Sequence, residues 1–191
     1  ATLPAAGSEV LAQDLTVTAP ARWDLESPQL YTLVTTVRRG GVVADCTETP
    51  FGIREIRFDP DRGFFLNGRP VKMKGGDVHQ DAGSLGTAIP DRAHERRVAL
   101  MKETGFNAIR CSHNPPAREF LDAYDRLGML VIDESFDKWK SGYYAEWYDD
   151  WWREDLAAMV LRDRKHLSTD GMLVVIVTIS SDDGSLIRSE E

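Results

Sequence analysis

The sequence predicts an α/β fold made of two parts, a β-rich N-terminal third and a longer part in which strands alternate with helices. The first third contains alternating apolar and β-branched residues with glycine turns between them. From residue 71 onward, four apolar strands are separated by three segments with helical spacing. This alternation implies a parallel sheet with right-handed crossovers. Four strands fit either a small open sheet or half of an eight-stranded barrel.

Short strands with turns between them are predicted in the first third. The segments "DLTVTAP" (14–20), "LYTLVTTV" (30–37) and "FGIREIRFD" (51–59) alternate between apolar and polar residues, and Gly40-Gly41 supplies a turn. Strands of this kind suggest a β-sandwich. About four strands are visible, which is fewer than a complete sandwich needs.

The alternating part begins after a predicted hairpin at Asn67-Gly68, a dipeptide that favours a tight turn between two strands. The helix over 116–127 has proline in its first turn and Gly128 at its end, as helix termini prefer. The predicted order is strand 71–75, helix 91–104, strand 106–112, helix 116–127, strand 129–135, a long helix within 146–166, and strand 172–180.

The composition indicates a soluble globular protein with a core of its own. Apolar residues make up 42%, charged residues 28%, and the net charge is −8, so nucleic acid and anionic membranes are not expected as partners. No run approaches the roughly 18 to 20 apolar residues of a membrane span. The first residues do not resemble a signal peptide, which favours the cytoplasm but leaves the compartment open. The two cysteines, Cys46 and Cys111, are expected to be free.

Polar side chains gather where the predicted strands end. In open α/β sheets and in barrels, function collects beyond the carboxyl ends of the strands. Histidines, acids, an arginine, an amide and an indole together suit a sugar, whose hydroxyls need polar partners and whose apolar face stacks on an aromatic ring. The candidates are Asp77, His79, Asp81, Arg110, His113, Asn114, Asp133, Glu134, Asp137, Trp139, Asp182 and Asp183.

Several of these candidates also have a purely structural interpretation. Arg110 could be an ion-pair partner inside a barrel, and Asp133 with Glu134 could serve only to orient it and to cap a helix. His113 could cap the second helix, although the prolines that follow favour a functional role. The tryptophans of "EWYDDWW" are expected to pack within a helix stripe, and His94 is expected to be structural. Because no tight ligand motif is present, no metal and no cofactor are expected.

Three stretches together resemble one known family. The sequences "FGIREIRFD…GFFLNGRPVKMKGGDVHQDAGSLG", "LMKETGFNAIRCSHNPP" and "LVIDESFDKW" are similar to glycoside hydrolase family 2, the β-galactosidase and β-glucuronidase group. "WDLESPQLYTL" resembles its immunoglobulin-like domain. The resemblance implies that residues 1–57 are the C-terminal part of an immunoglobulin-like β-sandwich domain. It implies that residues 58–191 are the first half of a (β/α)8 TIM barrel, and that the reaction is hydrolysis of terminal β-glycosides with retention.

The resemblance also assigns roles to site residues. His79 and His113 match histidines that contact the sugar, and Arg110 and Asn114 match positions that line the site. Asp133 and Glu134 match the acidic pair that ends the family's third barrel strand. Independently of the resemblance, Trp139 is the aromatic residue expected to contact the sugar. In this sequence "SFDKW" lacks the Glu-Thr-His that supplies metal ligands in some members, so no magnesium site is expected.

The C-terminal stretch departs from the family pattern. The family continues as Arg-Asp-Arg-Asn-His-Pro-Ser and then a strand that ends in Gly-Asn-Glu, whereas this chain reads "RDRKHLSTDG" and later "VTISSDDGS". An alignment of the two places Asp182 on the family's acid/base Glu and Ser181 on the Asn. Aspartate is one methylene shorter, and a misplacement of about 1 Å can cost on the order of 100-fold in rate.

The second carboxylate that retaining hydrolysis needs, about 5 to 5.5 Å away, lies on the seventh strand in this family. This chain ends after the fourth predicted strand, so we expect the chain alone to be inactive. A non-catalytic sugar-binding or assembly module and a β-glucuronidase-type specificity are the alternatives. Open strand edges of a half-barrel could also lead to self-association.

Overall fold

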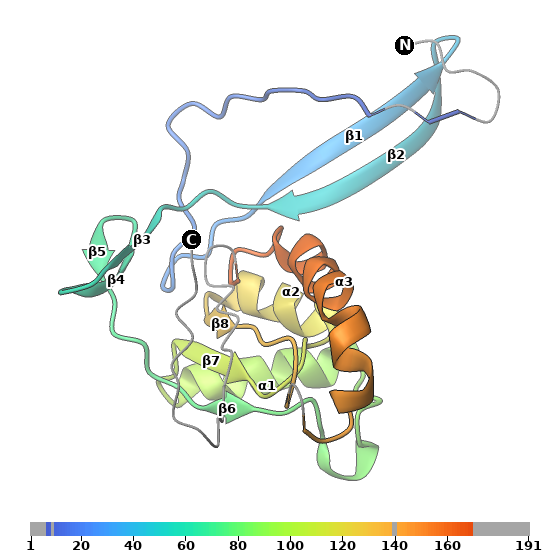
Figure 1. Ribbon diagram of the computed structural model, residues 1–191. Coiled ribbons are helices and arrows are strands. Elements are labelled where there is room, and N and C mark those ends of the chain that lie inside the picture. Colours follow the sequence, from blue (N-terminus) through green and yellow to red (C-terminus); the bar gives the residue numbers. More distant parts are fainter. Residues whose placement is uncertain (1–6, 9, 139–140, 170–191) are drawn as a thin grey trace.

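The computed structural model describes residues 7–8, 10–138 and 141–169 (Figure 1). A long two-stranded hairpin projects from an α/β body, and a small three-stranded sheet lies between them in the chain (Figure 1). The described elements are, in order, β1 (Tyr31–Arg39), β2 (Val42–Phe51), β3 (Ile56–Asp59), β4 (Gly63–Leu66), β5 (Arg69–Pro70), β6 (Asp77–Val78), a 3-10 turn at Gly83–Leu85, α1 (Asp91–Glu103), β7 (Ala108–Cys111), α2 (Arg118–Leu127), β8 (Leu130–Ile132) and α3 (Ala145–Asp163).

The hairpin formed by β1 and β2 confirms the predicted strand from residue 30 and its glycine turn. The strands pair antiparallel from Tyr31 opposite Phe51 to Arg39 opposite Val42. Gly40 and Gly41 both have positive φ, of 57° and 83°, which is the conformation that a tight primed turn requires. Two glycines in sequence therefore determine where the chain reverses.

The strand predicted at 14–20 is wrong, because that segment has no regular structure. Leu15, one of its apolar residues, is 69% exposed. Alternation alone does not make a strand, since the backbone also needs a neighbouring strand with which to pair. Within the described residues no such neighbour lies beside 14–20.

The predicted strand over 51–59 is divided in two. β2 ends at Phe51 and β3 begins at Ile56. Between them the Ile53 carbonyl accepts a hydrogen bond from the Trp23 amide at 2.8 Å. A side chain on Gly52 would meet Leu167, so the chain passes close to the segment that follows α3. These tertiary contacts redirect the chain and end the hairpin. The Asn67-Gly68 turn that follows is confirmed between β4 and β5.

The α/β body contains the parallel sheet that the alternation predicted. β6, β7 and β8 pair in that order, with Asp77 beside Arg110 and Ile109 beside Val131. The first strand of this sheet lies at Asp77–Val78 and not at 71–75 as predicted. Gly75 passes so close to the Ala108 carbonyl that a Cβ would lie 1.7 Å from its oxygen. The Lys74 and Gly76 carbonyls already accept hydrogen bonds from the amides of Ala108 and Arg110, at 3.2 and 3.1 Å, so the chain runs beside β7 just before the regular strand begins.

Two apolar clusters cover opposite faces of the parallel sheet. Ile109 and Val131 point towards α1 and α2, where they pack with Val98, Phe120 and Tyr124. Ala108 and Leu130, one residue out of phase, point to the other face. There they pack with Trp23, Leu25, Phe64, Leu66 and Leu167. The N-terminal segment thus supplies a fully buried tryptophan to the α/β body.

The predicted helices are confirmed, with ends within a few residues of those expected. His94 on α1 is buried against Phe120, with ring centroids 5.0 Å apart, in line with its structural interpretation. In α3, Trp152 stacks on Tyr148 as packing predicts. The same prediction is wrong for Trp147 and Trp151, which are 54% and 51% exposed.

Both cysteines are free, as expected. Among the described residues, no helix combines the length and the apolar character that a membrane crossing requires. The predicted strand at 172–180 lies outside the described residues.

Candidate functional site

Arg110, at the centre of the parallel sheet, organises the candidate site. Its Nε donates a hydrogen bond to Glu134 Oε1 at 2.6 Å, and its NH1 donates to Asp77 Oδ2 at 3.2 Å. Asp77 belongs to β6, Arg110 to β7, and Glu134 follows β8. One guanidinium therefore ties together the carboxyl ends of three adjacent strands, as the structural interpretation of Arg110 predicts.

His113 joins the same network from the loop after β7. Its Nδ1 lies 3.2 Å from Glu134 Oε2 and 3.3 Å from an Arg110 nitrogen, and its Nε2 lies 3.9 Å from Asp137. The ring is 35% exposed, whereas the Glu134 side chain is 3% exposed. The buried Glu134 carboxylate is thus held by Arg110 and His113, and part of the His113 ring faces solvent.

Of the remaining predicted site residues, some contact this network, some are only near it in the chain, and some lie outside the described residues. His79 is exposed and its ring meets that of His113 edge-on, with centroids 5.5 Å apart. Asn114 is exposed next to His113 in the chain. Trp139 and Asp182 lie outside the described residues, as does Asp183. The structure therefore brings together His79, Arg110, His113 and Glu134.

Two side chains that the sequence reasoning missed hold the loop after β6. Arg97 of α1 donates to the carbonyls of His79 and Asp81, at 2.9 and 2.7 Å. Gln80 accepts a hydrogen bond from the Ala117 amide at 2.6 Å, where α2 is about to begin. The only sequence signal was that Gln80 is a polar residue between two candidates. The geometry of α1 was needed to identify Arg97.

The network of Asp77, Arg110, His113 and Glu134 is called the rim below, and Asp133, next to Glu134 in the chain, is one of a pair of buried acids. Asp133 and Asp163 are both completely buried, and Arg162 donates to Asp163 at 2.6 Å. Within the described residues neither Asp133 oxygen has a hydrogen-bond partner. Burial, together with the nearby Asp163 carboxylate, raises the pKa of Asp133 to about 8. Asp133 therefore keeps its proton to a higher pH than an ordinary aspartate does, and it lies beside Glu134, which accepts a hydrogen bond from Arg110.

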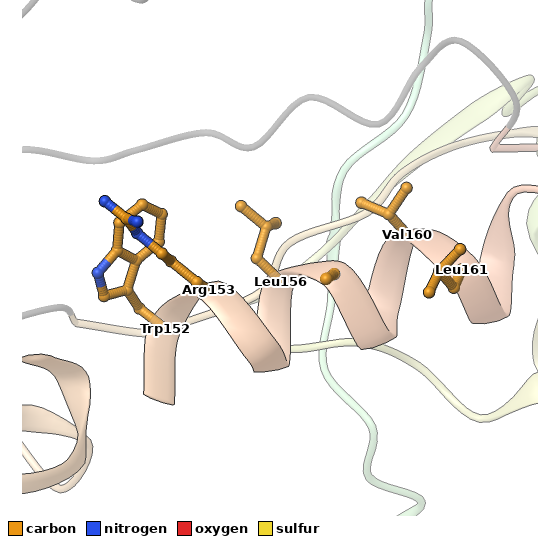
Figure 2. Close-up of a pocket in the computed structure, with 6 residues that line it drawn as sticks. Trp152, Arg153, Leu156, Val160 and Leu161 are labelled. Atoms are coloured by element: carbon orange, nitrogen blue, oxygen red, sulfur yellow. The ribbon is translucent and has the colours of Figure 1, made fainter. Parts of the chain in front are cut away.

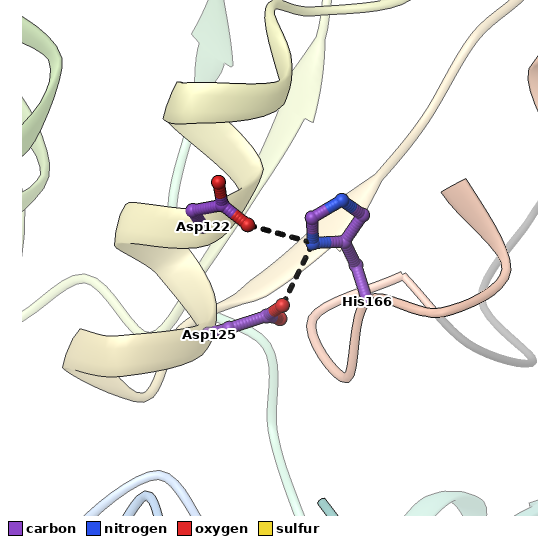
Figure 3. A group of neighbouring side chains, drawn as sticks. All are labelled: Asp122, Asp125 and His166. Carbon is purple, nitrogen blue, oxygen red and sulfur yellow. Dashed lines mark hydrogen bonds and ion pairs between the residues drawn. The ribbon is translucent and has the colours of Figure 1, made fainter. Parts of the chain in front are cut away.

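A second cluster, Asp122, Asp125 and His166, has the residue types of a metal site (Figure 3). His166 Nδ1 lies 2.8 Å from Asp125 and 3.7 Å from Asp122, and Asp125 also accepts the Ser168 amide at 2.6 Å. A metal on Nδ1 would move the ring proton to Nε2, which is buried without an acceptor among the described residues. The geometry therefore favours a structural role over metal binding: hydrogen bonds from His166 and Ser168 to Asp125 connect the segment after α3 to α2.

An apolar hollow runs along α3, and none of the residues that line it belongs to the candidate site (Figure 2). It measures about 460 Å³ and is lined by Trp152, Arg153, Leu156, Val160 and Leu161 with Ala157. Arg153 is its only charged residue, so the hollow lacks the convergent polar groups that a reactive site requires.

Comparison with known proteins places both parts of the chain. Residues 59–141 match the family model described as "Glycosyl hydrolases family 2, TIM barrel domain", and residues 2–54 match "Glycosyl hydrolases family 2". Residues 159–190 match a different model, "Ribonuclease J C-terminal domain". Neither family 2 match extends as far as Asp182, so the role predicted for that residue stays a prediction.

The similar proteins carry two kinds of name. A β-galactosidase, BoGH2A of Bacteroides ovatus, is 48% identical over 85% of this chain and 20% of its own length. A β-glucuronidase of Bacteroides fragilis is 37% identical over 67% of this chain and 19% of its own length. The crystal structure of a glycosyl hydrolase family 2 member from Bacteroides cellulosilyticus superposes with a TM-score of 0.74 at 49% identity, over 78% of this chain and 20% of that one. The chain thus spans about a fifth of the length of the relatives it matches.

Proposed function

This chain belongs to glycoside hydrolase family 2, and we propose that it contributes the sugar-binding rim of a β-glycosidase that hydrolyses terminal β-galactosides with retention. The observation that carries the proposal is the network of Asp77, Arg110, His113 and Glu134. It lies at the carboxyl ends of three parallel strands within the segment that matches the family's TIM-barrel domain.

The domain division follows from the same membership. We propose that residues 1–57 belong to an immunoglobulin-like β-sandwich domain and that residues 58–191 form the first half of the (β/α)8 barrel. The described order β6, α1, β7, α2, β8, α3 supports this, because each parallel strand is followed by a helix as in the first three units of a barrel. The fourth strand of this proposal falls at 172–180, outside the described residues.

The rim groups have distinct tasks in this proposal. Arg110 is a positioning residue, since its guanidinium is engaged by Glu134 and Asp77. His113, held by Glu134 and partly exposed, donates or accepts a hydrogen bond at its outer nitrogen, and His79 and Asn114 extend that polar edge. A sugar hydroxyl can both donate and accept, so neutral imidazoles next to carboxylates suit it.

The charge of the rim favours a neutral sugar over a uronic acid. Among the described residues there, the carboxylates of Asp77 and Glu134 contact the Arg110 guanidinium. The Asp137 carboxylate lies near His113 and pairs with Lys138, so three carboxylates face two cations. A uronate would add another negative charge to a site that already has an excess of them. This supports the galactoside assignment, although relatives bear both β-galactosidase and β-glucuronidase names.

A titration with galactonolactone tests the proposal. We expect binding by the 191-residue chain and a loss of about tenfold or more in affinity for Glu134→Gln, which keeps the shape but removes the charge that holds Arg110 and His113. Glu95→Gln is the matched control, because Glu95 also accepts a hydrogen bond from an arginine, Arg92 at 2.7 Å, but lies on the surface of α1. Equal affinities for the two variants would contradict the proposal, and tighter binding of glucuronate would shift it to the glucuronidase alternative.

Turnover is a separate question. We propose Asp182 as the stand-in for the family's acid, and we expect the 191-residue chain to bind sugar without hydrolysing nitrophenyl β-galactoside. Any measurable hydrolysis by the unmodified chain would contradict the expected inactivity, and hydrolysis that survives Asp182→Asn would contradict the assignment of Asp182. Binding without hydrolysis is also what a non-catalytic sugar-binding module would show.

Self-association through sheet edges is part of the proposal. In the described sheet β6 is an edge strand, and on the far side of β8 the Val131 amide already donates to the Ser168 carbonyl at 2.9 Å. We therefore propose β6 as the edge through which two copies pair. Sedimentation that shows only monomers at high protein concentration would rule this out.

A further inference from the structure

The N-terminal half of α3 presents aromatic side chains to solvent. Trp147 and Trp151 are 54% and 51% exposed, and Tyr143, just before the helix, is 99% exposed. Residues four apart lie on the same side of a helix. Trp147, Trp151 and Asp155 therefore form one continuous line along α3, which we call the aromatic track. Exposed indoles in sequence on one helix face are uncommon on a surface that binds nothing.

The aromatic track leads into a cavity. Asp155 accepts a hydrogen bond from the Tyr144 hydroxyl, and both side chains line a hollow of about 320 Å³. Phe136 stacks on Tyr144 with ring centroids 4.6 Å apart and lines the same hollow. Its volume is at the lower end of what small-molecule sites occupy. Unlike the apolar hollow of Figure 2, it combines aromatic rings with a carboxylate, a hydroxyl and the Arg162 guanidinium.

This cavity is bordered by the two loops that carry Asn114 and Glu134 of the candidate site. Its wall includes Pro115 and Ser135, which directly follow Asn114 and Glu134 in the chain. The loops that carry the rim therefore have one side facing the rim and the other facing this hollow.

The chemistry of the aromatic track identifies its ligand class. Indole faces stack on the apolar faces of pyranose rings, while carboxylates and phenols bind hydroxyls. The rise between residues four apart in a helix is about 6 Å, close to the length of one sugar unit in a glycan chain. Exposed Asp150 and Glu154 flank the tryptophans, which disfavours an anionic ligand.

We propose that Trp147, Trp151 and the Tyr144–Asp155 cavity form an accessory binding surface for the sugar units of an oligosaccharide beyond its terminal residue. This goes beyond the proposed function, since these side chains contact neither the terminal sugar nor the reacting bond. If this surface binds further sugar units, the preferred ligand is a chain of neutral sugars and not a single β-galactoside.

Calorimetric titration of the 191-residue chain with galactose and with a β-linked galactotetraose tests this inference. We expect the tetrasaccharide to bind at least tenfold more tightly than galactose. The double variant Trp147→Ala/Trp151→Ala should lose that advantage, about tenfold or more, with galactose binding unchanged. Phe58→Ala is the matched control, because Phe58 is also an aromatic residue that is 54% exposed but lies on β3. Its tetrasaccharide affinity should equal that of the unmodified chain.

The outcomes separate this inference from the proposed function. If the tetrasaccharide binds no more tightly than galactose, or if the double variant and Phe58→Ala bind it alike, the aromatic track is not a glycan surface. If galactose does not bind but the tetrasaccharide does, and the double variant abolishes this, the inference stands and the rim assignment fails. If neither sugar binds and the double variant changes only sedimentation, the track is a protein contact and the inference is overturned.

Discussion

The β1–β2 hairpin and the β6–β7–β8 sheet are both made of β-branched and apolar residues, yet they are stabilised differently. No residue of the hairpin is buried, and Val34, Val37 and Val42 are each more than half exposed. In β7 and β8, Ile109, Leu130 and Val131 are 2% exposed or less. The difference shows that pairing with a neighbouring strand is enough to form a strand, whereas a buried core also needs helices packed on the sheet.

The two regions also obtain their geometry from different sources. The hairpin depends on its turn and on cross-strand pairs such as Tyr31 with Phe51, whose rings stack at 5.5 Å. The parallel sheet has no direct turns, so its register comes from side chains that pack between sheet and helices. Substitutions in the two regions should therefore differ in size and in mechanism.

The largest effect is expected from truncating one leucine in each region. Leu130→Ala in β8 should lower the free energy of unfolding by about 2–5 kcal/mol, because it leaves a cavity beside Trp23 and Leu66. Leu33→Ala in β1 removes the same atoms from a side chain that is 37% exposed, and should change stability by about 0.5 kcal/mol or less. Urea denaturation of both variants measures the contrast. Similar losses would mean that the hairpin has a core of its own.

An intermediate effect is expected from the buried acid, and it depends on pH. Because the pKa of Asp133 is raised to about 8 in the folded state, the folded chain keeps a proton that the unfolded chain releases above about pH 4. Its contribution to stability is therefore fully present below about pH 4 and is lost as the pH rises from about 4 to 8.

Asp133→Asn removes this titration. The stability of the variant relative to the unmodified chain should increase steadily between pH 5 and pH 8, as followed by denaturation at several pH values. Asp137→Asn, at an exposed position on the same loop, is the control and should show no such trend. A difference that is constant with pH would show that Asp133 is ionised throughout.

The smallest effect is expected at the hairpin turn. Gly40 has φ of 57° and open space around its Cα, so Gly40→Ala introduces backbone strain without a clash. We expect a loss of about 1 kcal/mol, and Gly40→Asn should restore part of it because asparagine tolerates this conformation. Circular dichroism during thermal unfolding would follow both variants. A loss as large as that of Leu130→Ala would contradict the view that the hairpin contributes little to the core.

Some elements could be predicted from the sequence because their signals are local. Asn67-Gly68, Gly40-Gly41 and the proline-to-glycine span of α2 each specify a turn or a helix end within a few residues. The strand at 14–20 was predicted wrongly because pairing is not a local property. The displacement of the first parallel strand to Asp77–Val78 depended on how closely Gly75 approaches β7, which the sequence does not reveal.

The candidate site was predictable in position but not in detail. The rule that polar residues at strand ends converge predicted that His79, Arg110, His113 and Glu134 lie together, as they do in the structure. Their role in binding a sugar stays a prediction. It could not show that Arg110 is occupied by two carboxylates, that Arg97 and Gln80 hold the loop, or that Asp163 lies beside Asp133. These relations join residues far apart in the chain, and only packing brings them together.

By itself, the sequence determined the order of strands and helices, the sites of the tight turns, and the family to which the chain belongs, because these depend on neighbouring residues and on motifs. Only the tertiary structure decided which apolar residues are covered. It buried Trp23 against the α/β body and left Trp147 and Trp151 exposed on α3. The physical reason is that the burial of a side chain depends on which other segments pack against it. A tryptophan in the sequence does not reveal whether such a segment exists.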